Sequence, residues 1–325
     1  MAKEKIYPYA VAKIRVYESR LITKPSFIQL AEAKSADECV RILSELGYNN
    51  GNPFEVNEFE KVLSEENAKI YELMKEVVPD ENFIEVFVCK NDYHNLKVIL
   101  KSEISGVDGE KYIVSGGLVP VEIIKKAVVE RNYSILPKIM GESLNDAYDI
   151  YSKTQNGQYI DMVIDKACFK YMSEVANNSK NSFIIKYVEK LCDLTNIKSF
   201  MRVRKMKKSF ENTFKNVFIS GGTINFEYFR QAVNAENYYS VFKSTAYSSV
   251  CEAMDRSITE FEKLCDDYLM EYVKSAKYVA LTLEPLIAYI YAKETEIKTV
   301  RIIMTSKIND IDSDTIKERL REAYV

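Results

Sequence analysis

Apolar residues recur at helical spacing in three stretches of the chain that lie about one hundred residues apart. The matching positions are Leu96, Ile99 and Leu100, then Ile197, Phe200 and Met201, and then Ile297 and Val300. An i, i+3, i+4 spacing places one apolar stripe along a helix. The polar neighbours repeat in the same frame, and they are Asn95 and Lys97, Asn196 and Lys198, and Glu296 and Lys298. The pattern predicts three equivalent long helices.

A glycine turn follows the first two of these helices. Ser115-Gly116-Gly117 in the first copy matches Ser220-Gly221-Gly222 in the second, and each turn is followed by an apolar-periodic segment. The third copy lacks the glycines. We predict short helices over residues 121–129, 226–233 and 314–323, with Asn225 as the cap of the second. Ser35 followed by Glu38 predicts another helix start.

The order of these elements predicts an all-α chain built from three copies of a small helical bundle. Their approximate bounds are residues 23–115, 116–220 and 221–325, and residues 1–22 form an N-terminal helix that packs on the last repeat. A unit of about one hundred residues is longer than the 20–45-residue units of solenoid proteins. Only 10 glycines and 7 prolines occur in 325 residues, which agrees with long helices joined by short turns.

Composition narrows the classes of function. The 45 basic and 48 acidic residues give a net charge of −3, which argues against a nucleic-acid partner. The six cysteines form no CxxC pair and are expected to be reduced, mostly buried thiols of a cytoplasmic protein. The most apolar window, residues 278–292, contains Glu284 and Pro285 and is too short to span a bilayer.

Candidate chemistry is sparse. His94 is the only histidine, and we expect it to be a surface or interface side chain. No second histidine is left for a Ser-His-Asp or Cys-His set elsewhere, and one histidine cannot build a zinc site without thiolates nearby. The glycine turns lack the Lys-Ser/Thr of a phosphate-binding loop, and we expect no cofactor and no direct nucleotide binding. Asp266-Asp267 is the one enzymatic alternative, because paired aspartates on a helix can hold magnesium for diphosphate chemistry. A solvated acidic helix face explains the same residues.

The sequence resembles the C subunit of V-type and archaeal-type rotary ATPases, also called the d subunit or AC39, over nearly its whole length. The resemblance rests on the opening residues 7–15, on residues 92–97 and above all on residues 284–325. The last segment contains Pro285-Leu286 with Tyr289, Lys293-Glu294, Val300-Arg301 and a closing Arg321-Glu322-Ala323-Tyr324. Val300 replaces the isoleucine of the family pattern, and Glu296 stands where asparagine is more usual.

The resemblance implies a pseudo-threefold funnel of three helical bundles without catalytic activity. Proteins of this family belong to the central stalk of an ATPase that transports protons or sodium ions. They couple the shaft, made of the D and F subunits, to the membrane ring of proteolipids, and they lie peripherally on the cytoplasmic side of the membrane. An unrelated helical scaffold would share the repeats but not the C-terminal match.

Seven residues are candidates for structural or interface roles. They are Arg301, Lys97, Lys198, Lys298, Asn95, Asn196 and Glu296. Arg301 occupies the position of Leu100 and Met201, and a buried arginine needs a carboxylate partner, for which Glu294 and Glu318 are candidates. Alternatively, its aliphatic stem can extend so that the charge reaches the lining of the funnel. We therefore expect Arg301 to brace the third bundle. The three lysines can line one pseudo-symmetric surface facing the shaft, or they can form exposed salt bridges.

Overall fold

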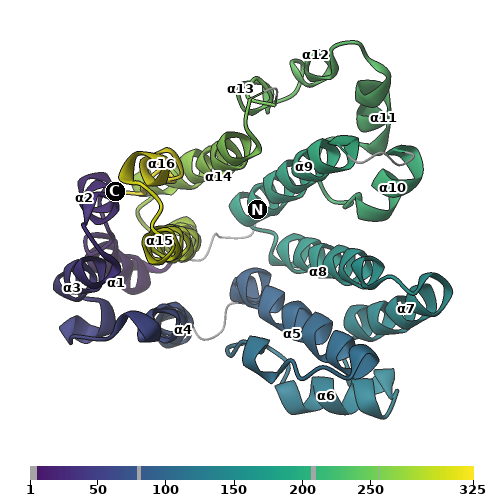
Figure 1. Ribbon diagram of the computed structural model, residues 1–325, viewed down its shortest axis with the longest axis horizontal. Helices are drawn as coiled ribbons and strands as arrows, with labels where there is room; N and C mark the ends of the chain where they lie inside the picture. The colour runs from purple at the N-terminus through teal and green to yellow at the C-terminus, as the bar shows by residue number, and fades with distance from the viewer. Residues whose placement is uncertain (1–5, 79–81, 206–209, 255) are drawn as a thin grey trace. The chain divides into compact units, whose positions relative to one another are not determined.

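Every regular element of the chain is a helix within the part that the structure describes. The computed structural model describes residues 6–78, 82–205, 210–254 and 256–325, and these ranges contain α-helices and short 3₁₀ helices (η) but no strand (Figure 1). The predicted all-α class is confirmed. The chain divides into two compact units, residues 82–248 and the two flanking segments 1–81 and 249–325. The threefold repeat stays a prediction.

The unit formed by the flanking segments is built around one long helix. Its helices are α1 (Pro8–Glu18), α2 (Lys24–Glu32), α3 (Ala36–Glu45), η1 (Tyr48–Gly51), η2 (Val56–Glu58), α4 (Phe59–Val77), α14 (Ile258–Lys274), η6 (Ser275–Tyr278), α15 (Glu284–Ile308) and α16 (Ser313–Glu318). Helix α15 packs against α1, α2, α3, α4, α14 and α16. Leu286, Ile287 and Ile290 are fully buried. The first turns of α15 are apolar on all sides because neighbours surround them.

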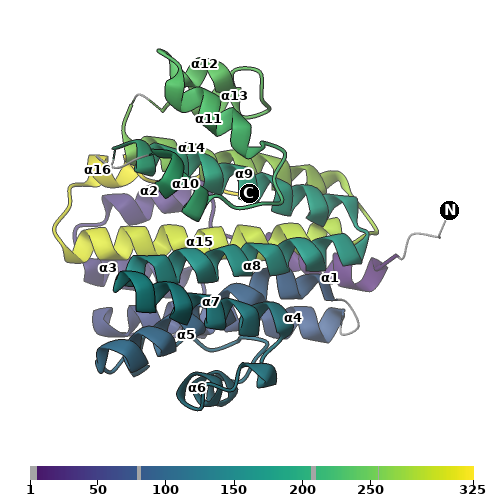
Figure 2. The same ribbon diagram turned by 90° about the vertical axis from the view of Figure 1, so that its right-hand side faces the viewer.

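The 82–248 unit is a bundle of long helices with a layer of short ones. Its helices are η3 (Asn82–Ile84), α5 (Glu85–Ser105), η4 (Glu110–Tyr112), α6 (Val121–Val129), η5 (Tyr133–Ile135), α7 (Lys138–Thr154), α8 (Gly157–Ser179), α9 (Ser182–Lys205), α10 (Phe210–Val217), α11 (Phe226–Asn234) and α12 (Tyr238–Phe242). Helix α13 (Ser248–Cys251) crosses the division between the units. Helix α8 packs against α5, α7 and α9, and Figure 2 shows α8 along α7.

An aromatic cluster fills the core of the bundle where α9, α10 and α11 meet. Phe200 is fully buried, and its ring lies 5.8 Å from that of Phe229 and 5.5 Å from that of Phe242, measured between centroids. The ring of Phe214 is 4.9 Å from that of Phe229. Tilted and edge-to-face pairs of this kind add to the stabilisation from buried apolar area.

Two of the three predicted short helices are confirmed, and the third is wrong at its end. Helix α6 covers residues 121–129 and α11 extends one residue beyond the predicted 226–233, with the Asn225 side chain accepting from the Tyr228 amide at 3.2 Å. Helix α16 ends at Glu318 instead of continuing to residue 323. The reason is tertiary, because the Glu322 amide donates to Asp267 at 2.7 Å. The chain after α16 therefore lies against α14 and leaves the helix.

Candidate structural anchors and interface residues

Asn95 and Asn196 fasten the segment that follows each long helix to that helix. Both side chains are buried, at 1% and 0% exposure. Asn95 Nδ2 donates to the Val114 carbonyl at 2.8 Å and its Oδ1 accepts from the Val114 amide at 2.9 Å. Asn196 makes the same pair with Ile219 at 2.7 and 2.8 Å. Each amide thus satisfies both backbone groups of one residue, which a buried backbone requires.

Asp92 and Asp193, three residues earlier, hold the glycine turns. The Asp92 carboxylate accepts from the Leu118 and Val119 amides at 2.9 and 3.0 Å. Asp193, which is fully buried, accepts from the equivalent amides of Thr223 and Ile224, both at 2.9 Å. Burial raises the pKa of Asp92, although its two backbone hydrogen bonds oppose that shift.

The second glycine of each turn is required by these carboxylates. A Cβ atom on Gly117 would lie 2.0 Å from Asp92 Oδ1, and one on Gly222 would lie 2.1 Å from Asp193 Oδ1. No side chain fits at such distances without displacing the carboxylate. The repeated Ser-Gly-Gly sequence is therefore explained by a close approach of backbone to carboxylate.

In the third copy, a buried ion pair takes the place of the asparagine side chain that binds the backbone in the first two. Glu296 is 4% exposed, and its carboxylate accepts from the Ile22 amide at 2.6 Å, from the Tyr48 hydroxyl at 2.8 Å and from Lys293 Nζ at 2.5 Å. Lys293 occupies the position of Asp92 and Asp193 and also lies 3.8 Å from a Glu66 carboxylate oxygen. The third copy has no glycine turn, so no turn amides are present for an aspartate at this position to bind. A lysine can therefore replace the aspartate.

The aspartate anchors were missed by the sequence interpretation, although a signal for them exists. Asp-x-x-Asn precedes the glycine turn in both copies, at residues 92–95 and 193–196, and becomes Lys-x-x-Glu at residues 293–296. Residues three apart on a helix share a face, so the aspartate and the asparagine reach the same returning segment. The third copy lacks both the aspartate and the glycine turn, which indicates that the aspartate and the turn depend on each other.

Arg301 is not buried, contrary to the expectation that it takes a core position. Its side chain is 45% exposed, and its Nε donates to the two carboxylate oxygens of Glu60 on α4 at 3.0 and 3.1 Å. The partner is neither Glu294 nor Glu318. An exposed pair of this kind contributes little to stability, so the proposed bracing of the third bundle has weak support.

The repeated lysines differ in their surroundings. Lys97 Nζ lies 2.6 Å from Asp165 on α8, and Lys298 Nζ lies 2.6 Å from Asp266 on α14. Lys198 is half-buried on α9. Lys97 and Lys298 therefore form ion pairs between neighbouring helices, as their alternative interpretation predicts. Their role in facing a shaft stays a prediction.

The carboxylates of Asp266 and Asp267 accept hydrogen bonds from lysine and arginine side chains and from a backbone amide of the same chain. Asp266 accepts from Lys298 and from Arg321 Nε, the latter at 3.1 Å. Asp267 accepts from Lys263 at 2.8 Å and from the Glu322 amide. These contacts connect the C-terminal segment to α14 and give the aspartate pair a structural role in place of the magnesium chemistry that its sequence allowed.

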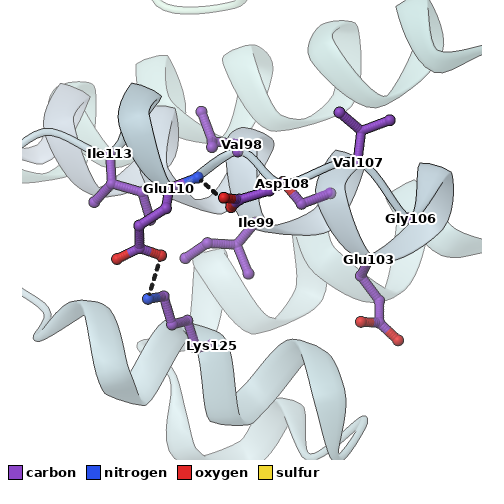
Figure 3. A pocket seen from close by; sticks show the side chains of 11 residues that line it. Val98, Ile99, Glu103, Gly106, Val107, Asp108, Glu110, Ile113 and Lys125 are labelled. Atoms are coloured by element: carbon purple, nitrogen blue, oxygen red, sulfur yellow. Dashed lines mark hydrogen bonds and ion pairs between the residues drawn. The ribbon is translucent and has the colours of Figure 1, made fainter.

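An open groove of about 350 Å³ lies where the end of α5, the following loop and α6 meet (Figure 3). Its walls include Val98, Ile99 and Ile113, and its charged residues are Glu103, Asp108, Glu110 and Lys125. In Figure 3, Glu110 pairs with Lys125 across the groove at 2.6 Å. Asp108 Oδ1 accepts from the Glu110 amide at 2.9 Å.

Burial limits the reactivity of the cysteine thiols. All six cysteines are buried thiols, as predicted, and burial raises the pKa of Cys39 to about 11 and that of Cys192 to about 12. Such thiols stay protonated at neutral pH and are poor nucleophiles. His94 Nε2 is hydrogen-bonded to the Tyr112 carbonyl at 2.9 Å.

Among residues of the described ranges, no three histidine, cysteine, aspartate or glutamate side chains gather to hold a metal ion. Within the same ranges, no helix combines the length and the apolarity needed to cross a bilayer.

Comparison with known proteins identifies the family. Residues 10–319 match the family model described as "ATP synthase (C/AC39) subunit". The chain is 26% identical to the C subunit of the V-type sodium ATPase of Enterococcus hirae, covering 96% of this chain and 97% of that protein. It is 25% identical to the C subunit of the A-type ATP synthase of Methanocaldococcus jannaschii, covering 97% and 86% respectively. The chain therefore belongs to the C/AC39 family and is a non-catalytic subunit of a V/A-type rotary ATPase.

Proposed function

We propose that this chain is the central-stalk component that couples the D–F shaft to the membrane ring of proteolipids, on the cytoplasmic side of the membrane. The family match over residues 10–319 carries this proposal. In this role the chain transmits torque during transport of protons or sodium ions, and a pseudo-threefold funnel is the shape expected for it.

The buried anchors support a role that requires stiffness. Asn95 and Asn196 each tie a long helix to the segment that returns across it, and Glu296 ties α15 to the backbone at Ile22. Asp92 and Asp193 add bonds from the same helix faces to the glycine turns. Close packing with satisfied buried polar groups gives low compliance, which a torque-bearing part needs.

Recovery of the complex tests the partners. The tagged full-length chain is purified from gently solubilised membranes at moderate salt, and co-purifying proteins are measured by mass spectrometry. The shaft proteins and the ring proteolipid should appear in fixed stoichiometry, whereas an untagged strain should yield neither. Recovery of a folded, monomeric chain without either partner would refute the proposal.

Ion transport tests the coupling. Reconstituted complex lacking this chain should hydrolyse ATP at the catalytic head but should not pump ions, and adding the purified chain should restore pumping. Undiminished pumping without the chain would show that torque passes by another route.

A further inference from the structure

Residues 319–325, called here the closing segment, leave helix α16 and enter a slot without forming regular structure. The slot belongs to the unit of residues 1–81 and 249–325, and its walls are side chains of α1, α14 and η6. Ala323 and Tyr324 are 5% and 3% exposed, and the Arg321 side chain is 8% exposed. An irregular segment that is buried this far needs specific partners for its polar groups.

Tyr324 is the aromatic anchor of the closing segment. Its hydroxyl donates to a carboxylate oxygen of Glu18 on α1 at 3.0 Å. The ammonium group of Lys277 in η6 lies 4.7 Å from the centroid of the Tyr324 ring, within the range of a cation–π contact. The slot therefore recognises both the hydroxyl and the ring of one tyrosine.

The residues before Tyr324 bind α14 through complementary charges. Arg321 Nε donates to Asp266 at 3.1 Å. The Glu322 amide donates to Asp267 at 2.7 Å, and its carboxylate accepts from Lys274 at 3.1 Å. An arginine, an acidic residue and a tyrosine are thus each matched by a group of the slot.

The groups that receive the closing segment are also held by partners outside it. These pairs are Glu18 with Arg15 at 2.7 Å, Asp266 with Lys298 at 2.6 Å, Asp267 with Lys263 at 2.8 Å and Lys274 with Glu271 at 3.1 Å. Each receiving group therefore has a second contact that fixes its orientation. Binding to groups that are already oriented costs little reordering.

The backbone of η6 is fixed to α1 in the same independent way. Arg15 Nη2 lies within hydrogen-bond distance of the carbonyls of Ala276, Lys277 and Val279, at 3.0, 3.0 and 2.7 Å. The Arg15 guanidinium therefore joins two walls of the slot without any contribution from the closing segment.

We propose that this slot is a preformed peptide-binding site and that the closing segment is its ligand, which leaves and returns while α14 and α15 stay folded. The peptide that fits is short and non-helical, with an arginine three positions before a tyrosine and an acidic residue between them. Asp266 selects the arginine, Lys274 the acidic residue and Glu18 the tyrosine hydroxyl. This recognition does not depend on the proposed function.

Binding of a fluorescent peptide of residues 319–325 tests the site in the full-length chain. The variant Arg321→Ala/Tyr324→Ala should bind this peptide saturably in fluorescence anisotropy, because its own closing segment competes poorly. Binding to the wild type should be weaker by about tenfold or more, which is 1.4 kcal/mol, because a tethered ligand acts at roughly millimolar effective concentration.

Two altered peptides are the controls. The peptide with Tyr324→Phe should bind the same variant about tenfold more weakly, because it leaves Glu18 without the hydroxyl donor, and a scrambled peptide should not bind. Equal binding of the scrambled and native peptides, or no binding of the native peptide to a variant that has wild-type helicity, would overturn the proposal.

Native-state hydrogen exchange of the wild-type chain tests the same proposal if the double variant does not fold. The Glu322 amide is hydrogen-bonded only while the closing segment occupies the slot. Its protection factor should be at least about tenfold smaller than that of the Ile290 amide in the buried part of α15, because opening of the segment is a local event. Equal protection of the two amides would mean that the segment leaves only on global unfolding, and the proposal would be wrong.

Discussion

Replacement of Gly117 by alanine isolates the contact between a glycine turn and a buried carboxylate. The new Cβ would lie 2.0 Å from Asp92 Oδ1 and 2.9 Å from its Cγ. Asp92 is only 1% exposed, so its carboxylate cannot turn into solvent without unpacking α5. Either the turn is strained or the two hydrogen bonds to the Leu118 and Val119 amides are lost.

The expected loss of stability lies between the costs of these two responses. Overpacking costs about 1–3 kcal/mol, and losing two hydrogen bonds to a charged acceptor costs about 3–6 kcal/mol in total. A mixture of strain and partial bond loss gives roughly 2–4 kcal/mol of unfolding free energy. Gly106→Ala is the matched control in the same loop, because it meets nothing within 4 Å and carries only the strain of φ +70°. That strain costs about 1–2 kcal/mol.

Thermal unfolding followed by far-UV circular dichroism measures both variants of the full-length chain. At about 2–4 °C per kcal/mol for a unit of this size, Gly117→Ala should melt roughly 5–15 °C below the wild type. Hydrogen exchange should also show faster exchange at the Leu118 and Val119 amides in Gly117→Ala alone. Equal melting of the two variants, with both amides still protected, would refute the role assigned to Gly117.

Other substitutions separate buried anchors from surface pairs, and each is read by urea unfolding of the full-length chain. Glu296→Gln should lower the free energy of unfolding by about 3–5 kcal/mol, because it breaks a buried ion pair with Lys293. Arg301→Ala should lower it by less than about 1 kcal/mol, because that pair is exposed. A reversed order would contradict both assignments. Phe200→Ala should lose about 3–5 kcal/mol through the cavity it leaves, and a loss under about 1 kcal/mol would mean that the aromatic cluster is not packed. Burial raises the pKa of Asp92 above its usual 3.8, so the stability of the wild type relative to Asp92→Asn should fall as pH rises from about 3.8 through the folded pKa. An advantage that grows over that window would show that the pKa is not raised.

Local pattern was sufficient for the helices and for the repeated frame. The apolar stripe containing Leu96 and the one containing Ile197 are each complete within five residues, and both are buried on long helices. The same local frame identified Asn95 and Asn196 as equivalent positions. Periodicity decides such features because the helix backbone alone determines which side chains share a face.

Contacts between distant segments could not be predicted in this way. Arg301 pairs with Glu60, which is 241 positions away, and Glu296 accepts from the Ile22 amide, 274 positions away. The stripe pattern placed Arg301 in the core because it assumed identical neighbours for all three long helices. Helix α15 has different neighbours at that point, where an exposed carboxylate of α4 is within reach. Only the folded arrangement of the chain supplies that information.

The bond between Ile22 and Glu296 has a consequence for synthesis on the ribosome. The unit that contains it is assembled from the first 81 and the last 77 residues, whereas residues 82–248 are contiguous. The contiguous unit can fold as soon as it emerges, but α4 must wait for α15, which is completed roughly 230 residues later. At about 5–20 residues per second, that interval is on the order of 10–50 s. During it the apolar faces of α2, α3 and α4 that pack against α15 stay uncovered, so they are the part of the nascent chain that most needs a chaperone.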